Sequence, residues 1–256
     1  MNPLDFATAL ARDAGTRLLE LSERPRSVRR KSHRNDLVTD ADHASEELIV
    51  AAIRQSYPAS SILIEESGIH RGTSDERWIV DPLDGTTNYA HGYPMYCVSI
   101  GYERAGELIA GVVYVPALDE CFAAELGSGA TLNGSPIAVS GVTAVADALV
   151  CTGFVPGKWE RNMHAFTRLM HQSQALRRDG AAALDLAFVA AGRFEAFWEF
   201  DLKPWDIAAG TLLVREAGGS VSAIDGRPLD LTGGSTLATN GAVHAEMLRL
   251  LSAPSE

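Results

Sequence analysis

The 256-residue sequence has few cysteines, and it lacks the spacings that mark a disulfide framework or a histidine-based metal site. Cys97, Cys121 and Cys151 are its only cysteines, and none belongs to a C-x-x-C pair. Each is flanked by apolar or β-forming residues, so we expect buried structural thiols. The seven histidines show no H-x-x-x-H spacing, which argues against a zinc site.

Long hydrophobic runs are absent as well. No apolar stretch reaches the roughly 18 residues that a membrane-spanning helix needs, so no membrane segment is expected. Residues 1–15 contain acids within a helical pattern and no continuous apolar core, which argues against a signal or transit peptide and favours the cytoplasm. A hydrophobic fraction of 46% and a charged fraction of 21% are typical of a soluble globular protein with one large or two small domains.

Positive charge is scarce. There are 22 lysines and arginines against 33 aspartates and glutamates, which gives a formal net charge of −11. General electrostatics would not hold such a protein on nucleic acid. One basic segment runs against this trend and contains Arg24, Arg26, Arg29, Arg30, Lys31 and Arg34. It can be a mobile loop near an anionic substrate or a merely solvated loop; a nucleic-acid patch is disfavoured because no aromatic residues are interleaved.

Hydrophobic periodicity predicts a first part that is rich in strands. Two amphipathic helices are expected first, over 3–20 and about 41–57, the second capped by Thr39 with Asp42 three residues later. Strands are then predicted over 61–65, 78–81, 96–103, 108–115 and 120–125. Ala105-Gly106 and Asn133-Gly134 predict hairpin turns.

From about residue 145 the predicted strands alternate with helices. The strands are expected over 148–152, 175–178, 194–199, 220–223 and 235–238, and the helices over 159–173, 181–191, 205–217 and 242–251. This change from consecutive strands to alternating strands and helices predicts two fused subdomains, 1–144 of α+β type and 145–256 of α/β type. Because no Pro/Ser-rich linker separates them, we expect an extensive shared interface.

The most informative segment is WIVDPLDGTTNY, residues 78–89. An apolar strand delivers Asp81, Pro82 fixes a turn, and Asp84 returns three residues later, so both carboxylates can face one point. Gly85 permits tight backbone geometry, and Thr86 marks a helix start whose free N–H groups favour an anion. Carboxylates beside an anion require cations, and hard oxygen ligands with phosphate suit Mg²⁺.

Two further segments carry acids at the ends of elements. Glu65 and Glu66 follow an apolar strand. Asp206 stands at a helix start in PWDIAAG, residues 204–210, where the small residues allow close packing against a neighbouring element. Taken alone, Asp206 is more often a helix N-cap than a metal ligand.

In this order, Glu65-Glu66, DPLDGTTN (residues 81–88) and WDIAAG (residues 205–210) resemble the inositol monophosphatase family. Lys31 and the segment 36–42 also match the family, so the resemblance covers nearly the whole chain. It implies a layered αβαβα sandwich of α+β / α/β class. Most metal ligands would lie in 1–144, and Asp206 and the substrate side in 145–256.

The resemblance also implies roles for individual residues. Glu65, Asp81 and the backbone carbonyl of Leu83 would hold a first Mg²⁺. Asp81, Asp84 and Asp206 would hold a second, and a third, weaker ion would use Glu65. Thr86, with Asp42 behind it, and Glu65 would orient and activate the attacking water, with Glu66 supporting the ligands from behind. The implied substrate contacts are Lys31, Gly85, Thr86, Ala182 and Glu199, with Thr152 a weaker candidate.

The implied reaction is the Mg²⁺-dependent hydrolysis of a small phosphate monoester by metal-activated water, with no Ser, Cys or His nucleophile. Inositol 1-phosphate is the first expected substrate. Histidinol phosphate, fructose 1,6-bisphosphate, 3′-phosphoadenosine nucleotides and NADP stay open, and Glu199 with Asp201 could form an acidic pocket for histidinol phosphate. A partner role in transcription or ribosome assembly is a further alternative. The resemblance also implies a lithium-sensitive homodimer.

Overall fold

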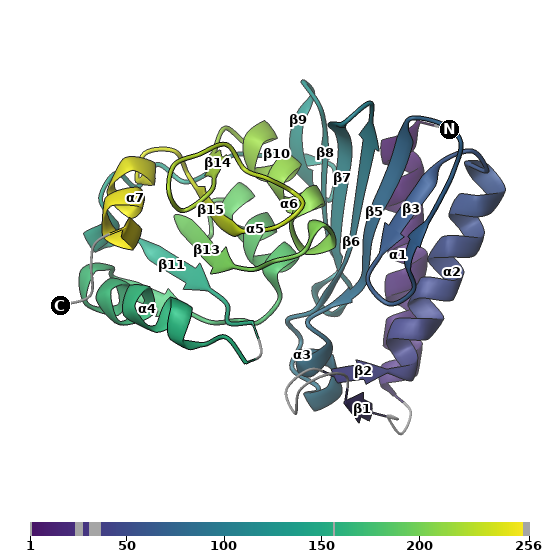
Figure 1. Ribbon diagram of the computed structural model, residues 1–256, viewed down its shortest axis with the longest axis horizontal. Coiled ribbons are helices and arrows are strands. Elements are labelled where there is room, and N and C mark those ends of the chain that lie inside the picture. The colour runs from purple at the N-terminus through teal and green to yellow at the C-terminus, as the bar shows by residue number, and fades with distance from the viewer. Residues whose placement is uncertain (1, 24–27, 31–36, 156, 253–256) are drawn as a thin grey trace.

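Two β-sheets and the helices around them form five layers in the computed structural model, which describes residues 2–23, 28–30, 37–155 and 157–252 (Figure 1). The α-helices are α1 (Pro3–Ser22), α2 (Asp40–Ser56), α3 (Thr86–His91), α4 (Glu160–Gln172), α5 (Ala182–Ala190), α6 (Pro204–Glu216) and α7 (His244–Ser252). No described helix is both long enough and apolar enough to cross a membrane.

The larger sheet has the strand order β10-β9-β8-β7-β6-β5-β3-β4. Its strands are β3 (Ser61–Ile64), β4 (Gly68–His70), β5 (Glu76–Asp84), β6 (Cys97–Arg104), β7 (Glu107–Val115), β8 (Glu120–Glu125), β9 (Gly129–Leu132) and β10 (Ser135–Ile137). All neighbours are antiparallel except β3 and β5, which are parallel. Ala105 and Gly106 both have positive φ, as do Asn133 and Gly134, which confirms the two predicted hairpin turns.

The smaller sheet has the order β12-β11-β13-β15-β14. Its strands are β11 (Leu149–Thr152), β12 (Ala175–Arg177), β13 (Ala196–Phe200), β14 (Ser220–Ser222) and β15 (Ser235–Thr239). A separate antiparallel pair, β1 (Val28–Arg30) and β2 (Leu37–Thr39), lies beside α3 at the bottom of Figure 1. Lys31 and most of the basic segment 24–34 lie outside the described residues.

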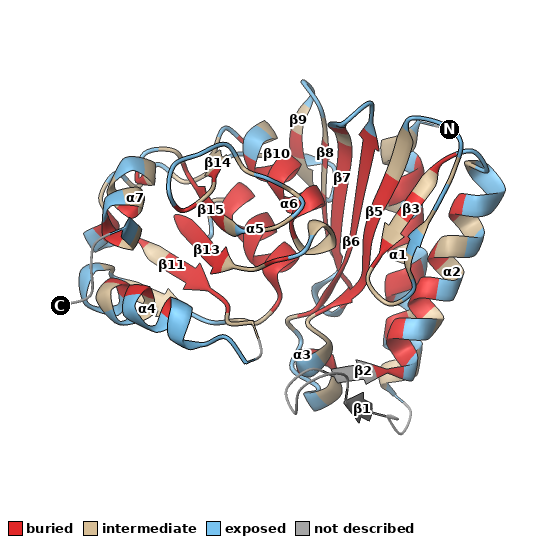
Figure 2. Ribbon diagram, viewed as in Figure 1, coloured by how far each residue is buried: buried red, intermediate tan, exposed pale blue. Residues whose placement is uncertain are grey.

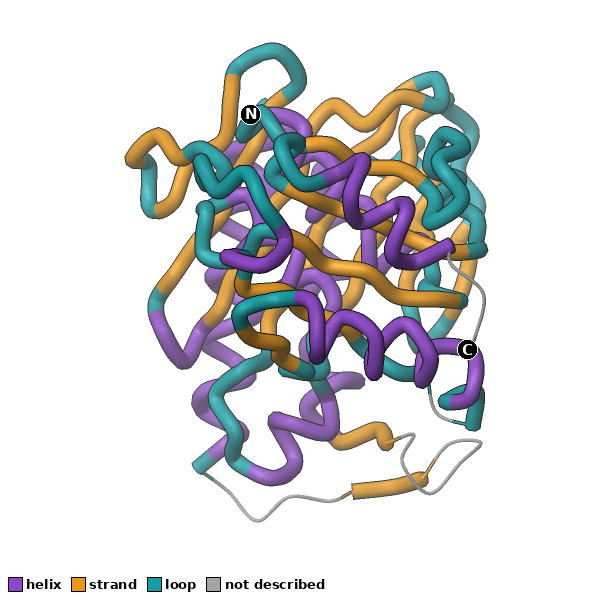
Figure 3. Tube along the Cα trace, turned by 90° about the vertical axis from the view of Figure 1, so that its left-hand side faces the viewer, coloured by secondary structure: helices purple, strands orange, loops and turns teal. Residues whose placement is uncertain are grey.

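Three hydrophobic cores separate the layers and confirm the predicted αβαβα sandwich. One core lies between the helices α1 and α2 and the larger sheet. The second joins that sheet to α5, α6 and the smaller sheet, and the third lies between the smaller sheet and α4 and α7. Figure 2 shows buried residues on both sheets and on α5 and α6, with exposed faces on the outer helices. Figure 3 views the molecule from the side of α4 and α7, which lie in front of the strands.

The middle layer is close-packed because small residues face each other there. A Cβ added at Gly101 of β6 would lie 3.1 Å from the Cβ of Ala208, and one at Gly111 of β7 would lie 2.8 Å from the backbone oxygen of Ala209. On the opposite side of α6, a Cβ at Gly210 would lie 2.5 Å from the Cβ of Leu186 in α5. The predicted close packing of the segment after Asp206 is therefore confirmed, and the start of α6 is held against the larger sheet.

Residues before and after position 145 share this middle core. The boundary between 1–144 and 145–256 stays a prediction. The three cysteines are all buried, as expected. Trp78 and Trp198 are fully buried in the outer cores, which excludes them from contact with a ligand.

Candidate functional site

Asp81 and Asp84 both belong to β5, which carries a β-bulge between them. Asp81 pairs with Ser99 and Asp84 with Cys97, so three steps along β5 match two steps along β6. In a regular strand, residues three apart point to opposite faces, and the extra residue turns the two carboxylates to the same face. The prediction of a turn at Pro82 was wrong, because the strand runs on through it. The bulge is held by Leu83, whose N–H donates to Asp81 Oδ1 (3.0 Å), and by Ser45, whose hydroxyl donates to the Pro82 carbonyl (2.8 Å).

Glu65 reaches the same place from the neighbouring strand. β3 runs parallel to β5 with Ile64 opposite Val80, so Glu65 emerges beside Asp81 where both strands point toward one sheet edge. Glu66 follows, and its N–H donates to the buried carboxylate of Glu46 (3.2 Å), which fixes the backbone directly after Glu65. The supporting role expected for the Glu66 side chain stays a prediction.

Asp206 enters from the first turn of α6. Its Oδ2 accepts a hydrogen bond from the Lys203 N–H (2.7 Å), so it caps the helix as well as facing the cluster. The Ser99 hydroxyl donates to the carbonyl of Trp205 (3.3 Å), and Ser99 is the residue that pairs with Asp81. Asp206 can therefore both cap α6 and belong to the acidic cluster.

The N-terminus of α5 contacts Asp84 from the second half of the chain. The Ala183 N–H donates to Asp84 Oδ2 (2.7 Å), and the Cys97 thiol lies 3.6 Å from the same oxygen. Asp84 is 9% exposed and Asp81 only 2%. The two carboxylates are thus held in a largely dry environment where their charges interact strongly.

The electrostatics of these acids show that they converge. Burial raises the pKa of Asp81 well above its usual range, and Glu65, Asp84 and Asp206 raise it further by repulsion. Burial raises the pKa of Asp84 to about 6, although the Ala183 N–H opposes that shift. Burial likewise raises the pKa of Asp206, with Asp84 and Glu65 adding to the effect and the Lys203 N–H opposing it. Without a cation this cluster repels itself.

Thr86 and Asp42 are also brought together. The Thr86 hydroxyl lies 2.9 Å from Asp42 Oδ1 and 3.1 Å from the Leu83 carbonyl and can donate to either. Asp42 is fully buried, and its Oδ2 accepts from the N–H and hydroxyl of Thr39, which confirms the predicted capping box. Gly85 precedes Thr86 at φ +86°, and a Cβ there would lie 2.9 Å from the Met95 carbonyl. Both its conformation and its surroundings require glycine.

Glu199 is the penultimate residue of β13, on the other side of the cluster. It is 7% exposed, and burial raises its pKa well above the usual range, with Asp206 and Asp84 adding to the shift and Arg178 opposing it. Its carboxylate lies over Gly153, because a Cβ at that glycine would be 2.0 Å from Glu199 Oε2. Ala182 begins α5, next to the Ala183 N–H that holds Asp84.

Two expectations on this side were wrong. Thr152 is fully buried, its hydroxyl donates to the Trp198 carbonyl (2.5 Å) and accepts from Asn162 (2.8 Å), so it does not face a ligand. Asp201 is paired with Arg161 (2.7 Å) and Lys158 (3.4 Å). Its charge is therefore neutralised, and the acidic pocket of Glu199 with Asp201 does not form.

Sequence patterns missed the residues that hold this constellation. Ser45, Glu46 and Gly153 lie far along the chain from the groups they contact, which are the Pro82 carbonyl, the Glu66 N–H and the Glu199 carboxylate, and no local spacing distinguishes them. For Gly153 the signal is tertiary: Thr152 pairs with Trp198 in parallel register, so the next position faces Glu199.

Residues 2–255 match the model of the "Inositol monophosphatase family". The chain belongs to that family. An inositol-1-monophosphatase of Synechocystis is 44% identical over 98% of this chain and 88% of its own length. The Nus factor SuhB of Pseudomonas aeruginosa is 44% identical over 93% and 91%. A solved IMPase/NADP phosphatase complexed with Mg²⁺ and phosphate has a TM-score of 0.88 at 26% identity, covering 98% of this chain and 95% of the other.

Membership of the inositol monophosphatase family makes this protein a phosphoric monoester hydrolase. The structure brings Glu65, Asp206 and the two carboxylates of β5 together from positions up to 141 residues apart, Glu65 to Asp206, and their role as metal ligands stays a prediction.

Proposed function

We propose that this protein hydrolyses inositol 1-phosphate to inositol and phosphate in a Mg²⁺-dependent reaction. The observation that supports this proposal most is the convergence of Glu65, Asp81, Asp84 and Asp206, whose mutual repulsion needs a cation, beside Thr86 and opposite Glu199.

The donor set fits Mg²⁺. All the side-chain donors are carboxylate oxygens, which Mg²⁺ prefers, and the Leu83 carbonyl adds another oxygen. Glu65, Asp81 and Leu83 would hold one ion, and Asp81, Asp84 and Asp206 a second, with two to three ions in all. When bound, Mg²⁺ supplies the positive charge that lowers the pKa of water and offsets charge on the leaving oxygen.

The chain's own residues would position water and phosphate. Thr86 can hold its hydroxyl toward Asp42, which leaves the Thr86 oxygen as an acceptor for the attacking water. Glu65 would accept the second hydrogen of that water. The backbone of Gly85 and Thr86 would bind the phosphate oxygens where α3 begins.

Thr86→Val is expected to lower kcat by about 10²- to 10⁴-fold, because valine keeps the shape but cannot position water. Mg²⁺ affinity should stay within about threefold, since no side-chain ligand is removed. The matched control is Thr87→Val at the exposed neighbouring position, where kcat should be unchanged. Steady-state kinetics with both variants measure this, and a Thr86→Val enzyme of normal kcat would contradict the role.

On the substrate side, Glu199 would accept hydrogen bonds from the hydroxyls of the polyol, and Ala182 would lie against its ring. The ion pairs of Asp201 disfavour an ammonium-bearing substrate such as histidinol phosphate, because only one acid is left to face it.

Gly153→Ala should raise the KM for inositol 1-phosphate by about 10- to 100-fold, since the new methyl group displaces the Glu199 carboxylate and removes its hydrogen bonds. A substrate without hydroxyls near the ester, such as p-nitrophenyl phosphate, should lose much less. Gly141→Ala is the matched control, because a Cβ there meets open space. Equal losses on both substrates would mean that Gly153 acts on the metal side instead.

The proposal is tested by phosphate release from inositol 1-phosphate, histidinol phosphate, fructose 1,6-bisphosphate, 3′-phosphoadenosine 5′-phosphate and NADP. Each is assayed with Mg²⁺, with chelator and with added lithium. A Mg²⁺-dependent preference for inositol 1-phosphate is expected. A preference for another of them keeps the reaction and changes the substrate.

A second candidate role is favoured by the relative named Nus factor SuhB, 44% identical over most of both chains. In this role the protein would act as a partner of transcription machinery, with catalysis secondary. Asp84→Asn separates the two: a cell that keeps its phenotype with this variant, shown in vitro to be inactive, would favour the partner role. We also propose a cytoplasmic homodimer, which fractionation and analytical ultracentrifugation test.

A further inference from the structure

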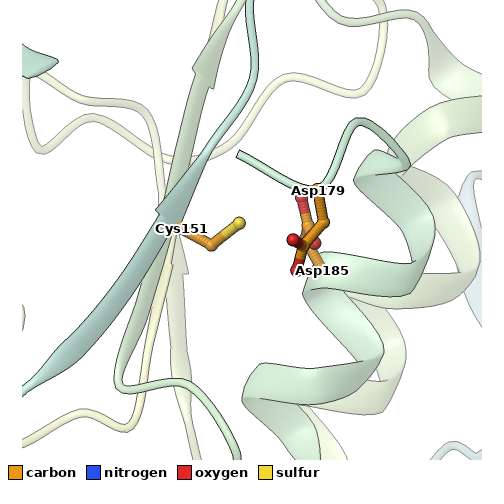
Figure 4. A group of neighbouring side chains, drawn as sticks. All are labelled: Cys151, Asp179 and Asp185. Atoms are coloured by element: carbon orange, nitrogen blue, oxygen red, sulfur yellow. The ribbon is translucent and has the colours of Figure 1, made fainter. Parts of the chain in front are cut away.

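A second group of metal-binding side chains lies outside the proposed catalytic cluster. Cys151 comes from β11, Asp179 from the loop before α5, and Asp185 from α5 itself. The Cys151 Sγ and one carboxylate oxygen from each aspartate all lie within 4.8 Å of one another. Figure 4 shows the thiol pointing at the two carboxylates, which lie side by side across the space between the strand and the helix.

Asp185 is the unusual member of this group. It is 1% exposed, and among the described residues neither of its carboxylate oxygens has a well-formed hydrogen bond; the Cys151 thiol that faces it acts only as a weak donor. A buried carboxylate with no stronger donor than a thiol is unfavourable in a protein interior, unless it keeps its proton or faces a cation. A carboxylate that points at a second carboxylate and a thiol has the surroundings of a cation site.

The local field favours positive charge. Burial raises the pKa of Asp185 well above its usual range, and Asp179, Asp84 and Glu199 add to the shift by repulsion, while the Cys151 thiol opposes it as a weak donor. Burial also raises the pKa of Asp179, which Arg177 partly opposes. In the described ranges, no lysine or arginine forms an ion pair with Asp179 or Asp185.

We propose that Cys151, Asp179 and Asp185 form a binding site for a thiophilic divalent cation such as Zn²⁺, separate from the Mg²⁺ cluster. One thiolate and two carboxylates, with water as the fourth ligand, make a tetrahedral set that Zn²⁺ accepts and that Mg²⁺ does not prefer. On binding, the thiol proton and the Asp185 proton leave to solvent. No histidine takes part, which is why histidine spacing could not reveal the site.

The geometry requires only small shifts. Metal–ligand lengths of about 2.3 Å to sulfur and about 2.1 Å to oxygen place tetrahedral ligand atoms roughly 3.4–3.6 Å apart. The observed separations of up to 4.8 Å close to that value by side-chain rotation of about 1 Å. The cation would then tie β11 and the loop before α5 to the helix whose Ala183 N–H holds Asp84.

Cobalt(II) is the probe for this site, because a cobalt–thiolate bond gives a charge-transfer band in the near ultraviolet and a carboxylate site does not. Full-length, chelator-treated protein is titrated with Co²⁺ while Mg²⁺ is in large excess, which occupies the carboxylate cluster. Wild type should bind one Co²⁺ with this band, and Zn²⁺ should displace it. Cys151→Ala and Asp185→Asn should each lose the band, and equilibrium dialysis should show at least tenfold weaker Zn²⁺ binding.

Two cysteine controls make the result specific. Cys121→Ala changes a buried thiol elsewhere, and Cys97→Ala changes the thiol beside Asp84. Both should keep the band. A band lost in Cys97→Ala and kept in Cys151→Ala would assign the metal to the catalytic cluster and overturn the proposal. So would wild type without the band, in which case Asp185 is a buried neutral acid. Circular dichroism confirms that each variant is folded.

Discussion

Asp206→Asn is expected to lower kcat by roughly 10³-fold or more while leaving the fold intact. Losing one preorganised electrostatic group in an active site costs about 10²- to 10³-fold, and a ligand charge removed from a coupled cluster costs at least as much. The fold survives because the cap survives. The asparagine carbonyl oxygen can still accept the Lys203 N–H that Asp206 Oδ2 accepts at 2.7 Å.

A loss of kcat without a loss of stability in Asp206→Asn would separate a catalytic role of this residue from a structural one. Asp206→Ala would remove both the charge and the cap, so its free energy of unfolding should be about 1 kcal/mol lower than that of Asp206→Asn. Asp225→Asn is the control, because Asp225 is exposed and also accepts a backbone N–H, that of Arg227. Its kcat should stay within about twofold of wild type. Kinetics and thermal melts of the three variants measure this, and wild-type turnover in Asp206→Asn would remove that residue from the ligand set.

Mg²⁺ is expected to stabilise the protein strongly, and more at pH 8 than at pH 5. The reason is the repulsion between the buried carboxylates of the metal-free cluster, which grows as they lose their protons. Asp84 has a pKa of about 6 in the fold against an ordinary value of 3.8, so between these values the folded protein binds more protons than the unfolded chain. The free energy of unfolding therefore falls as the pH rises through that window, by about 3 kcal/mol for Asp84 alone.

The other acids extend this effect. Asp81 and Asp206, whose pKa values burial and repulsion raise well above the usual range, move the loss of stability to higher pH. His244, whose pKa burial lowers, acts in the opposite sense. Bound Mg²⁺ offsets the repulsion, and at 100 times its Kd it contributes about 2.7 kcal/mol by mass action.

Thermal melts in chelator and in Mg²⁺, at pH 5 and pH 8, test this expectation. In chelator the melting temperature should be lower at pH 8, and Mg²⁺ should remove most of the difference. Asp84→Asn is the internal control. Without its charge, the metal-free protein should melt higher than wild type at pH 8 and depend less on pH. Equal wild-type melting temperatures with and without Mg²⁺ at pH 8 would contradict a metal site at this cluster.

Local pattern was enough for much of the fold. The apolar periodicity of α1 and α2, the alternation in the second half and the two hairpin turns depend on residues close in sequence, and all agree with the structure. Short strands were missed: β4, β9 and β10 have three or four residues each, too few for a period to be read.

The sequence also predicted which residues form the candidate site. Carboxylates, a glycine and threonines stand in a fixed order from Asp81 to Thr87, and the family resemblance linked them to Glu65 and Asp206. The arrangement of these residues in space could not be predicted from the sequence. The two β5 carboxylates share a face because of a bulge that depends on pairing with β6, and Glu65 joins them only through the parallel register of β3 with β5.

Only the tertiary structure decided what surrounds those acids. Three contacts show this: Gly153 with Glu199, Asp201 with its two basic partners, and Cys151 with Asp185. Each joins residues that are 34 or more positions apart in the chain. Sequence spacing carries information over one or two turns of a helix or along one strand. Burial, dielectric and charge repulsion are properties of the assembled layers, so the pKa shifts of the acids at the two proposed cation sites arise only once the two sheets enclose α5 and α6.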